Sequence, residues 1–126
     1  MSPKSDQEDS NAPEITFEKL IYDYGNIKQN EDGICEFVFK NTGNEPLILS
    51  NARSTCGFTV PSWPNEPILP GHTNKIKVQY NTSRIGPINK SITVSSNAKN
   101  SIVVLFIKGN VGTVNEENKR ERNTEK

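Results

Sequence analysis

The feature that most constrains the fold of this chain is an alternation of apolar and polar residues with a period of two. In residues 35–40 the side chains of Cys35, Phe37 and Phe39 occupy every second position, and residues 75–80 repeat the pattern. Successive side chains of a β-strand point to opposite faces of a sheet, so each segment predicts a strand with one buried face. No window of about ten residues has a helical apolar stripe free of Gly, Pro and Asn, which predicts almost no helix.

The pattern extends along the body of the chain as a series of short strands divided by turns. We expect strands over residues 15–17, 20–27, 35–40, 46–50, 75–80, 88–95 and 102–111. Turns rich in Gly, Pro, Asn and Asp are expected at 32–33, 41–45, 70–72, 84–87 and 97–100. Roughly seven to eight strands at such regular spacing are typical of an immunoglobulin-like antiparallel β-sandwich, so we predict an all-β protein of this class.

One loop makes a specific prediction about pairing. The segment Asn41–Glu45 is typical of a hairpin loop, with Gly43 suited to positive φ. The strands on its two sides would then pair antiparallel, with Lys40 opposite Pro46.

Charge and composition divide the chain into a body and two polar ends. The 126 residues include 15 basic and 15 acidic ones, for a formal net charge of zero. We expect a disordered N-terminal spacer over residues 1–14, a sandwich domain over 15–114 and a disordered charged tail over 115–126. The basic residues of the body are too scattered for a nucleic-acid footprint, so we expect no nucleic-acid partner.

The N-terminal spacer bears on the location of the protein. A polar segment such as Ser2 to Glu14 often follows a removed export or lipoprotein signal, although a native cytosolic start would look the same. We expect an exported protein, periplasmic or held at the outer membrane by a lipid anchor, with a cytoplasmic location as the alternative. Any contact with a membrane would be through that anchor.

Four evenly spaced prolines follow the predicted hairpin. Pro61, Pro64, Pro67 and Pro70 recur at every third residue, which is the pitch of a polyproline II helix. Such a segment is either a ligand for an aromatic groove or a stiff crossover along one edge of the sandwich, and we favour the crossover. Trp63 either packs onto the core or projects as a binding anchor. The first three prolines and Trp63 form a candidate interaction surface.

The two cysteines and the single histidine limit the chemistry. A disulfide between Cys35 and Cys56 requires the chain to turn back after Ser54; otherwise Cys35 is a small buried hydrophobe and Cys56 an independent thiol. His72 lies in a Pro-Gly turn without an evident orienting partner, so we predict no catalytic triad and no enzyme. The spacing of Cys35, Cys56 and His72 matches no zinc pattern, and we expect no metal and no cofactor.

At the level of whole motifs the chain resembles the bacterial DUF1573 family. The matching segments, in order, are 37–43 (FVFKNTG), 46–48 (PLI), 54–57 (STCG), 67–71 (PILPG), 76–80 (IKVQY), Gly86, 90–94 (KSITV), 96–97 (SN) and 109–111 (GNV). The resemblance implies an immunoglobulin-like domain related to major sperm protein, ASH, hydin and pilus-chaperone modules. It also implies a small exported protein or lipoprotein without an established enzyme activity. Where the family often has Cys-Gly-Cys, this chain has Cys56-Gly57-Phe58, so Phe58 would cap the sandwich end in place of a thiol pair.

Two classes of function remain, with a third less favoured. The first is a monomeric structural or protein-interaction module of the cell envelope that docks another protein through strand edges or the proline crossover. The second is a module for a small ligand or carbohydrate, which requires at least two rings of a set to lie coplanar on one exposed face. That set is Trp63, Tyr22, Tyr24 and Tyr80. The third is a copper or zinc carrier that uses Cys35, Cys56 and His72.

Overall fold

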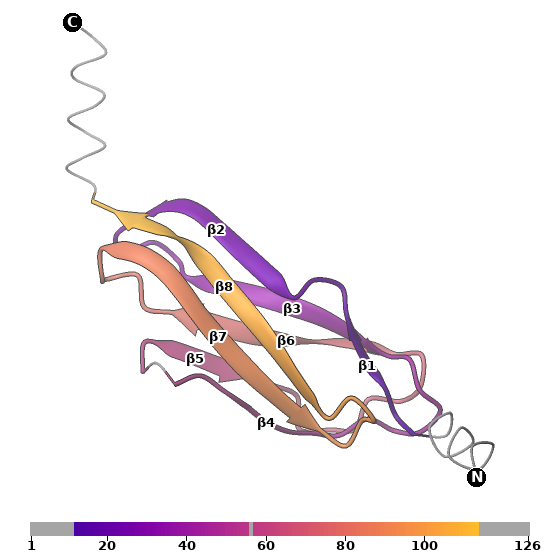
Figure 1. Cartoon of the computed structure of the whole chain (residues 1–126). Helices are drawn as coiled ribbons and strands as arrows, with labels where there is room; N and C mark the ends of the chain where they lie inside the picture. Colours follow the sequence, from indigo (N-terminus) through magenta and orange to yellow (C-terminus); the bar gives the residue numbers. More distant parts are fainter. Residues whose placement is uncertain (1–11, 56, 114–126) are drawn as a thin grey trace, which may run out of the picture.

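The chain folds into two four-stranded β-sheets packed face to face (Figure 1). The structure is a computed structural model that describes residues 12–55 and 57–113. Its strands are β1 (Ile15–Phe17), β2 (Ile21–Lys28), β3 (Ile34–Asn41), β4 (Leu49–Arg53), β5 (Thr59–Ser62), β6 (Thr73–Tyr80), β7 (Gly86–Ser96) and β8 (Ile102–Gly112). No helix is present among the described residues, which confirms the all-β, immunoglobulin-like sandwich.

The first two strands of the chain lie in different sheets. Sheet A has the order β1-β3-β6-β5 and sheet B the order β2-β8-β7-β4. After β1 the chain crosses to the other sheet, where β2 pairs parallel to β8; the other neighbouring strands pair antiparallel. Because β2 begins opposite Phe106, residues 102–105 of β8 pair in the described structure with β7 alone.

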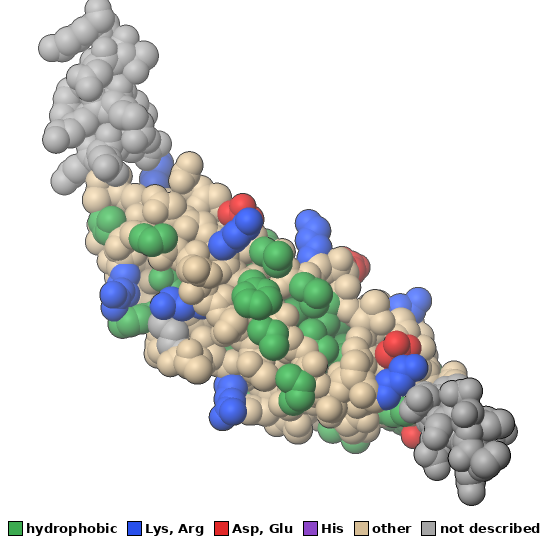
Figure 2. Space-filling model, viewed as in Figure 1, with side chains coloured by type: hydrophobic (Ala, Val, Ile, Leu, Met, Phe, Trp, Pro, Cys, Tyr) green, Lys and Arg blue, Asp and Glu red, His purple; other side chains and the backbone are tan. Residues whose placement is uncertain are grey.

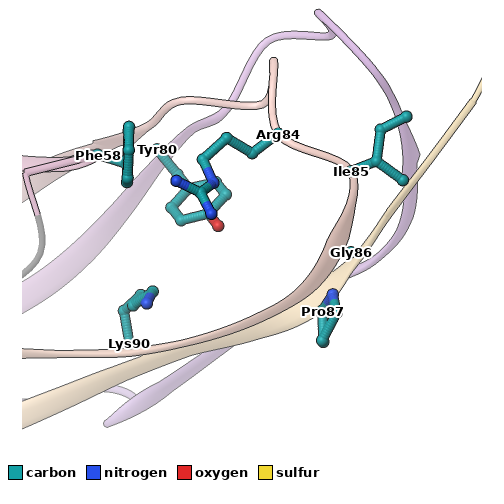
Figure 3. Close-up of a pocket in the computed structure, with 7 residues that line it drawn as sticks. All are labelled: Phe58, Tyr80, Arg84, Ile85, Gly86, Pro87 and Lys90. Carbon is teal, nitrogen blue, oxygen red and sulfur yellow. The ribbon is translucent and has the colours of Figure 1, made fainter.

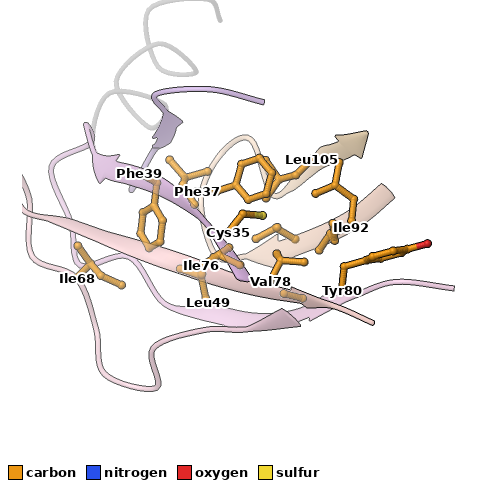
Figure 4. Packing of buried hydrophobic residues seen from close by; sticks show 14 of the residues in the cluster. Cys35, Phe37, Phe39, Leu49, Ile68, Ile76, Val78, Tyr80, Ile92 and Leu105 are labelled. Carbon is orange, nitrogen blue, oxygen red and sulfur yellow. The ribbon is translucent and has the colours of Figure 1, made fainter. Parts of the chain in front are cut away.

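The hydrophobic core fills the space between the sheets (Figure 4). Phe37 and Phe39 of β3 face Ile92 of β7 and Leu105 of β8, all at most 2% exposed. The predicted inward faces of residues 35–40 and 75–80 are both confirmed, because Cys35, Ile76 and Val78 are buried as well. Burying a large aliphatic or aromatic side chain contributes about 1.5–3 kcal/mol, so this layer is the main source of stability.

The predicted hairpin between β3 and β4 is wrong. The two strands lie in different sheets, and β3 already has β1 on one side and β6 on the other. Lys40 pairs with Thr16 and Thr73 rather than with Pro46. The segment after Asn41 therefore crosses from sheet A to sheet B.

The buried side chain of Asn41 holds this crossing in place. Its Nδ2 donates to the carbonyl oxygens of Glu45 at 2.7 Å and Ile68 at 2.8 Å, and its Oδ1 accepts from the Gly43 amide at 2.9 Å. Leu47 and Ile68 then exchange two main-chain hydrogen bonds across the sandwich. Gly43 does not have the positive φ that we predicted. Glycine is needed there because an added Cβ would collide with the Ala12 carbonyl oxygen.

Two further details differ from the expected pattern. The turn expected at Asp32-Gly33 lies earlier, at Asn30, which has a φ of 68°. Residues 59–62, expected as part of the proline crossover, form the edge strand β5. Pro61 fits there because an edge strand has one side without a sheet partner, where a missing N–H costs no ladder bond. The turn at Pro70-Gly71 is confirmed, with Gly71 at a φ of 83°.

Candidate functional site

Cys35 is a buried thiol inside the core. It is 3% exposed and free in the structure, and burial raises the pKa of its thiol above the ordinary value of 9.0. A protonated, enclosed thiol is a poor nucleophile and a poor metal ligand. Cys56 lies outside the described residues, so the Cys35–Cys56 disulfide stays a prediction, although the hairpin register on which we based its geometry does not form.

The described residues argue against a thiol and histidine metal carrier. Cys35 pairs with Val78 on β6, whereas His72 precedes the first residue of that strand and is exposed. Six strand residues span about 20 Å, so Cys35 and His72 cannot bind the same ion. Among the described residues no group of three or more His, Cys, Asp and Glu side chains gathers as a metal site.

The predicted aromatic stacking platform is also wrong. Tyr80 is buried at 5% exposed, and the Tyr24 hydroxyl donates to the Gly33 carbonyl oxygen at 2.7 Å. Tyr22 meets Tyr24 edge to face, with the ring planes at 76°. Trp63 is half-buried and packs against the core. These rings close the sandwich and do not offer two coplanar faces to a sugar.

The prolines are divided between a strand and a loop. Pro61 is half-buried in β5, Pro64 is half-buried after it, and Pro67 is exposed. Trp63, between them, does not project as an anchor. An interaction surface at Trp63, Pro61, Pro64 and Pro67 stays a prediction.

The sequence pattern did not predict the exposed apolar side chains on the outer face of sheet B. The run Ile102–Ile107 is apolar at every position, a pattern typical of a strand covered on both faces. Leu105 and Ile107 are indeed buried, but Ile102, Val104 and Phe106 are 58%, 38% and 43% exposed.

Neighbouring strands extend this row. Ile21 of β2, 50% exposed, pairs with Phe106. On the other side Phe106 and Val104 pair with Ser91 and Thr93 of β7, whose side chains are short. Hydrophobic side chains gather at the centre of the face seen in Figure 2. We call the set Ile21, Ile102, Val104 and Phe106 the β8 patch.

The outer face of sheet A is different. Glu36 of β3 and Lys75 of β6 form an ion pair at 3.2 Å there, and Lys40 and Lys77 are exposed on the same strands. Such alternation of inward apolar and outward polar residues is expected for a sheet that faces water. Sheet A still exposes two large apolar side chains, Ile34 of β3 and Val60 of β5, which lie on either side of Gln79. The apolar row of sheet B on β2 and β8 is the longer of the two.

A second feature is a hollow at the side of the sandwich, beside the first half of β7. It is lined by Phe58, Tyr80, Arg84, Ile85, Gly86, Pro87 and Lys90 and has a volume of about 210 Å³ (Figure 3). Phe58 is 38% exposed, so it caps the core only in part. The Arg84 guanidinium lies 4.3 Å from the centre of its ring. In the sequence, the indication of this hollow is Lys90, a charged residue at an inward position of β7 between Ile88 and Ile92.

Solved structures confirm the fold. A protein of unknown function from Porphyromonas gingivalis W83 matches with a TM-score of 0.70 and 14% identity over 81% of this chain and 48% of that one. The seventh ASH/PapD-like domain of human CEP192 matches with a TM-score of 0.69 and 8% identity over 82% and 89%. This chain thus spans about half of the Porphyromonas gingivalis protein.

A third match is a chain of the CsuC–CsuE chaperone–tip adhesion subunit pre-assembly complex from the Csu pili of Acinetobacter baumannii. It has a TM-score of 0.53 and 13% identity, over 77% of this chain and 56% of that one. At these identities the matches show an immunoglobulin-like sandwich and nothing of the function.

No curated protein matches the chain. No helix in the described part of the chain is long and apolar enough to cross a membrane.

Family membership is shown by the sequence itself. The family described as a protein of unknown function, DUF1573, matches residues 15–111, which is most of the sandwich. The chain therefore belongs to the DUF1573 family.

Proposed function

We propose that this protein is a non-catalytic interaction module of the cell envelope and that it binds another protein through the β8 patch. The observation that carries the proposal is the exposure of Val104 and Phe106 on a strand whose sequence is apolar on both faces. Solvent-exposed strands usually carry polar residues on the outer face, and a contiguous apolar patch marks an interaction site.

The free energies of burial and of association indicate which interactions the partner must supply. Full burial of a large apolar side chain contributes about 1.5–3 kcal/mol, and the side chains of the patch are already about half buried, so each adds roughly 1 kcal/mol. Association costs about 4–15 kcal/mol of translational and rotational freedom. Apolar contact over four side chains is therefore too weak alone.

The unpaired part of the β8 edge can supply the missing interactions; it lies between Asn100, whose side chain bonds to Ile15, and Phe106, whose amide donates to the Leu20 carbonyl. Residues 102–105 have a neighbour on the β7 side only, within the described structure. An extended segment of the partner placed beside them would form main-chain hydrogen bonds and cover Ile102 and Val104 together. We therefore infer a partner with an extended apolar segment, bound by strand addition.

The envelope location rests on the family resemblance, because DUF1573 members are typically small exported proteins or lipoproteins. Fractionation of cells of the source organism tests this part by itself. We expect the protein with the periplasm or outer membrane, and recovery with the cytoplasm would contradict the location without touching the interaction surface.

Site-specific photo-crosslinking tests the interaction. A benzophenone amino acid at Phe106 is expected to give one discrete crosslinked product in cells of the source organism, absent without irradiation. Ile34 is the matched control, because it is 42% exposed on the outer face of sheet A, against 43% for Phe106. Equal products from both positions, or none from Phe106, would contradict the proposal. A product of twice the protein mass would show a second copy rather than another protein and would also overturn it.

A further inference from the structure

The hollow beside Phe58 lies where β4 has ended, so that sheet B has one strand fewer. β4 ends at Arg53, opposite Thr93, so residues 86–92 of β7 pair only with β8 in the described structure. Phe58, before β5, and the loop that carries Arg84 stand across this gap from β7 (Figure 3). The hollow is thus open to solvent at the side of the sandwich.

Lys90 is a charged residue at a position of β7 where the alternation of the strand places apolar residues. On β7 the neighbouring inward positions, Ile88 and Ile92, are 2% and 0% exposed. Lys90 pairs with the buried Ile107, so its side chain points to the same side as theirs, and the residue is only half-buried. Its ammonium group therefore lies by the solvent-filled hollow and not on the outer face of the sheet.

Arg84 supplies a second positive charge across the hollow. Its guanidinium packs on the Phe58 ring, a cation–π contact that restricts its position. The residues that line the hollow include no carboxylate, and neither Arg84 nor Lys90 has an ion pair within the described part of the chain. Two cations therefore face one small space without a counter-charge.

We propose that this hollow binds a single carboxylate side chain, Asp or Glu, from an acidic segment of another protein. Its volume of about 210 Å³ is below the roughly 300–1,000 Å³ of sites for drug-sized ligands, which suits one small group. Arginine can grip a carboxylate with two parallel hydrogen bonds, and lysine adds a point charge. The apolar walls at Phe58 and Ile85 suit the methylene stem of the acidic side chain.

This site is separate from the β8 patch, and the proposal holds whether or not the patch binds a protein. Phe106 and the other patch residues face outward from sheet B, whereas Lys90 faces inward. Failure of the crosslinking test at Phe106 would therefore leave the carboxylate site standing, and the reverse also holds.

Titration with a blocked tetraglutamate peptide tests the proposal on the full chain by nuclear magnetic resonance. At low ionic strength we expect saturable shifts of the Phe58 ring, the Arg84 side chain and the amides of residues 84–90. The matching tetraglutamine peptide is expected to give none. Lys90→Met and Arg84→Gln should each weaken binding at least about 10-fold, because a hydrogen bond to a charged group contributes about 1.5–3 kcal/mol and about 1.4 kcal/mol is a factor of ten. Lys77→Met, at an exposed lysine on sheet A, should leave binding unchanged.

The variants Lys90→Met and Arg84→Gln are both expected to leave the fold intact. Lys90→Met preserves length and places an apolar group at an inward position, and Arg84 is exposed. Absence of saturation, equal binding of the glutamine peptide, or equal weakening by Lys77→Met would overturn the site. Tighter binding of inorganic phosphate than of tetraglutamate would overturn the carboxylate as its ligand.

Discussion

At the scale of single residues, the polar side chains inside the sandwich decide features that the apolar pattern cannot. Asn41 is fully buried, and its side chain bonds to four main-chain groups, those of Glu14, Gly43, Glu45 and Ile68. From sequence, Asn-Thr-Gly is typical of a hairpin loop, because the local chemistry of a turn and of a buried asparagine cap is the same. The bonding partner Ile68, 27 residues away, distinguishes the two, and it is not encoded nearby.

Asn41→Ala tests the role of this side chain. It removes the hydrogen bonds from Asn41 to the Ile68 and Glu45 carbonyls and from the Gly43 amide, while the Ile68 carbonyl keeps its bond from the Leu47 amide. An unsatisfied buried group costs about 1–3 kcal/mol, so we expect a loss of about 1–3 kcal/mol in the free energy of unfolding, measured by denaturant titration. Asn89→Ala, at an exposed position of β7, should change it by less than about 0.5 kcal/mol. Similar values for the two variants would contradict the role of Asn41.

Cys35 and Tyr24 predict how stability depends on pH. Burial raises the pKa of both groups above the ordinary 9.0 and 10.0. The unfolded chain then loses these protons at a lower pH than the folded protein does, so unfolding becomes easier as pH rises. The free energy of unfolding should be flat near neutral pH and fall above about pH 9. The fall should be shallower in the double variant Cys35→Ala, Tyr24→Phe, and an equal fall would contradict this assignment.

At the scale of elements, the strands were predictable and their partners were not. The period of two located β3, β6 and β7 closely, because it reflects burial of one face, and the continuous apolar run located β8. The strand expected over residues 46–50 begins later, at Leu49. Sheet membership depends on contacts between distant segments, which is why the crossing to β4 and the parallel pairing of β2 with β8 were missed. β5 was missed because Pro61 argues against a central strand and is tolerated at an edge.

The pairing of β2 with β8 depends on Gly109. This residue has a φ of 152°, and an added Cβ would lie 2.9 Å from the Gly25 carbonyl oxygen of β2. Gly109→Ala should therefore lower the free energy of unfolding by about 1–3 kcal/mol. Gly57→Ala is the control, since nothing lies within 4 Å of a Cβ there. Equal unfolding free energies of the two variants would contradict the close approach of the strands.

At the scale of the whole molecule, the sandwich has two unlike outer faces and one open side. The polar outer positions of β3 and β6 in sheet A were predictable from the alternation of residues 35–40 and 75–80. The two candidate sites were not, because each is a departure from that alternation. Val104 and Phe106 are apolar where water is expected, and Lys90 is charged where the core is expected. Both departures are visible in the sequence only after the facing of β7 and β8 is known.

The central claim is that the β8 patch holds another protein. The most direct measurement is the native mass of the protein in mild-detergent extracts of cells of the source organism, compared among the unmodified chain, Phe106→Glu and Ile34→Glu. Both substitutions replace a similarly exposed apolar side chain, so neither should unfold the sandwich. We predict that the unmodified chain and Ile34→Glu migrate in a larger complex, whereas Phe106→Glu migrates as a monomer. Migration of all three proteins as monomers, or of all three in the same complex, would contradict the claim.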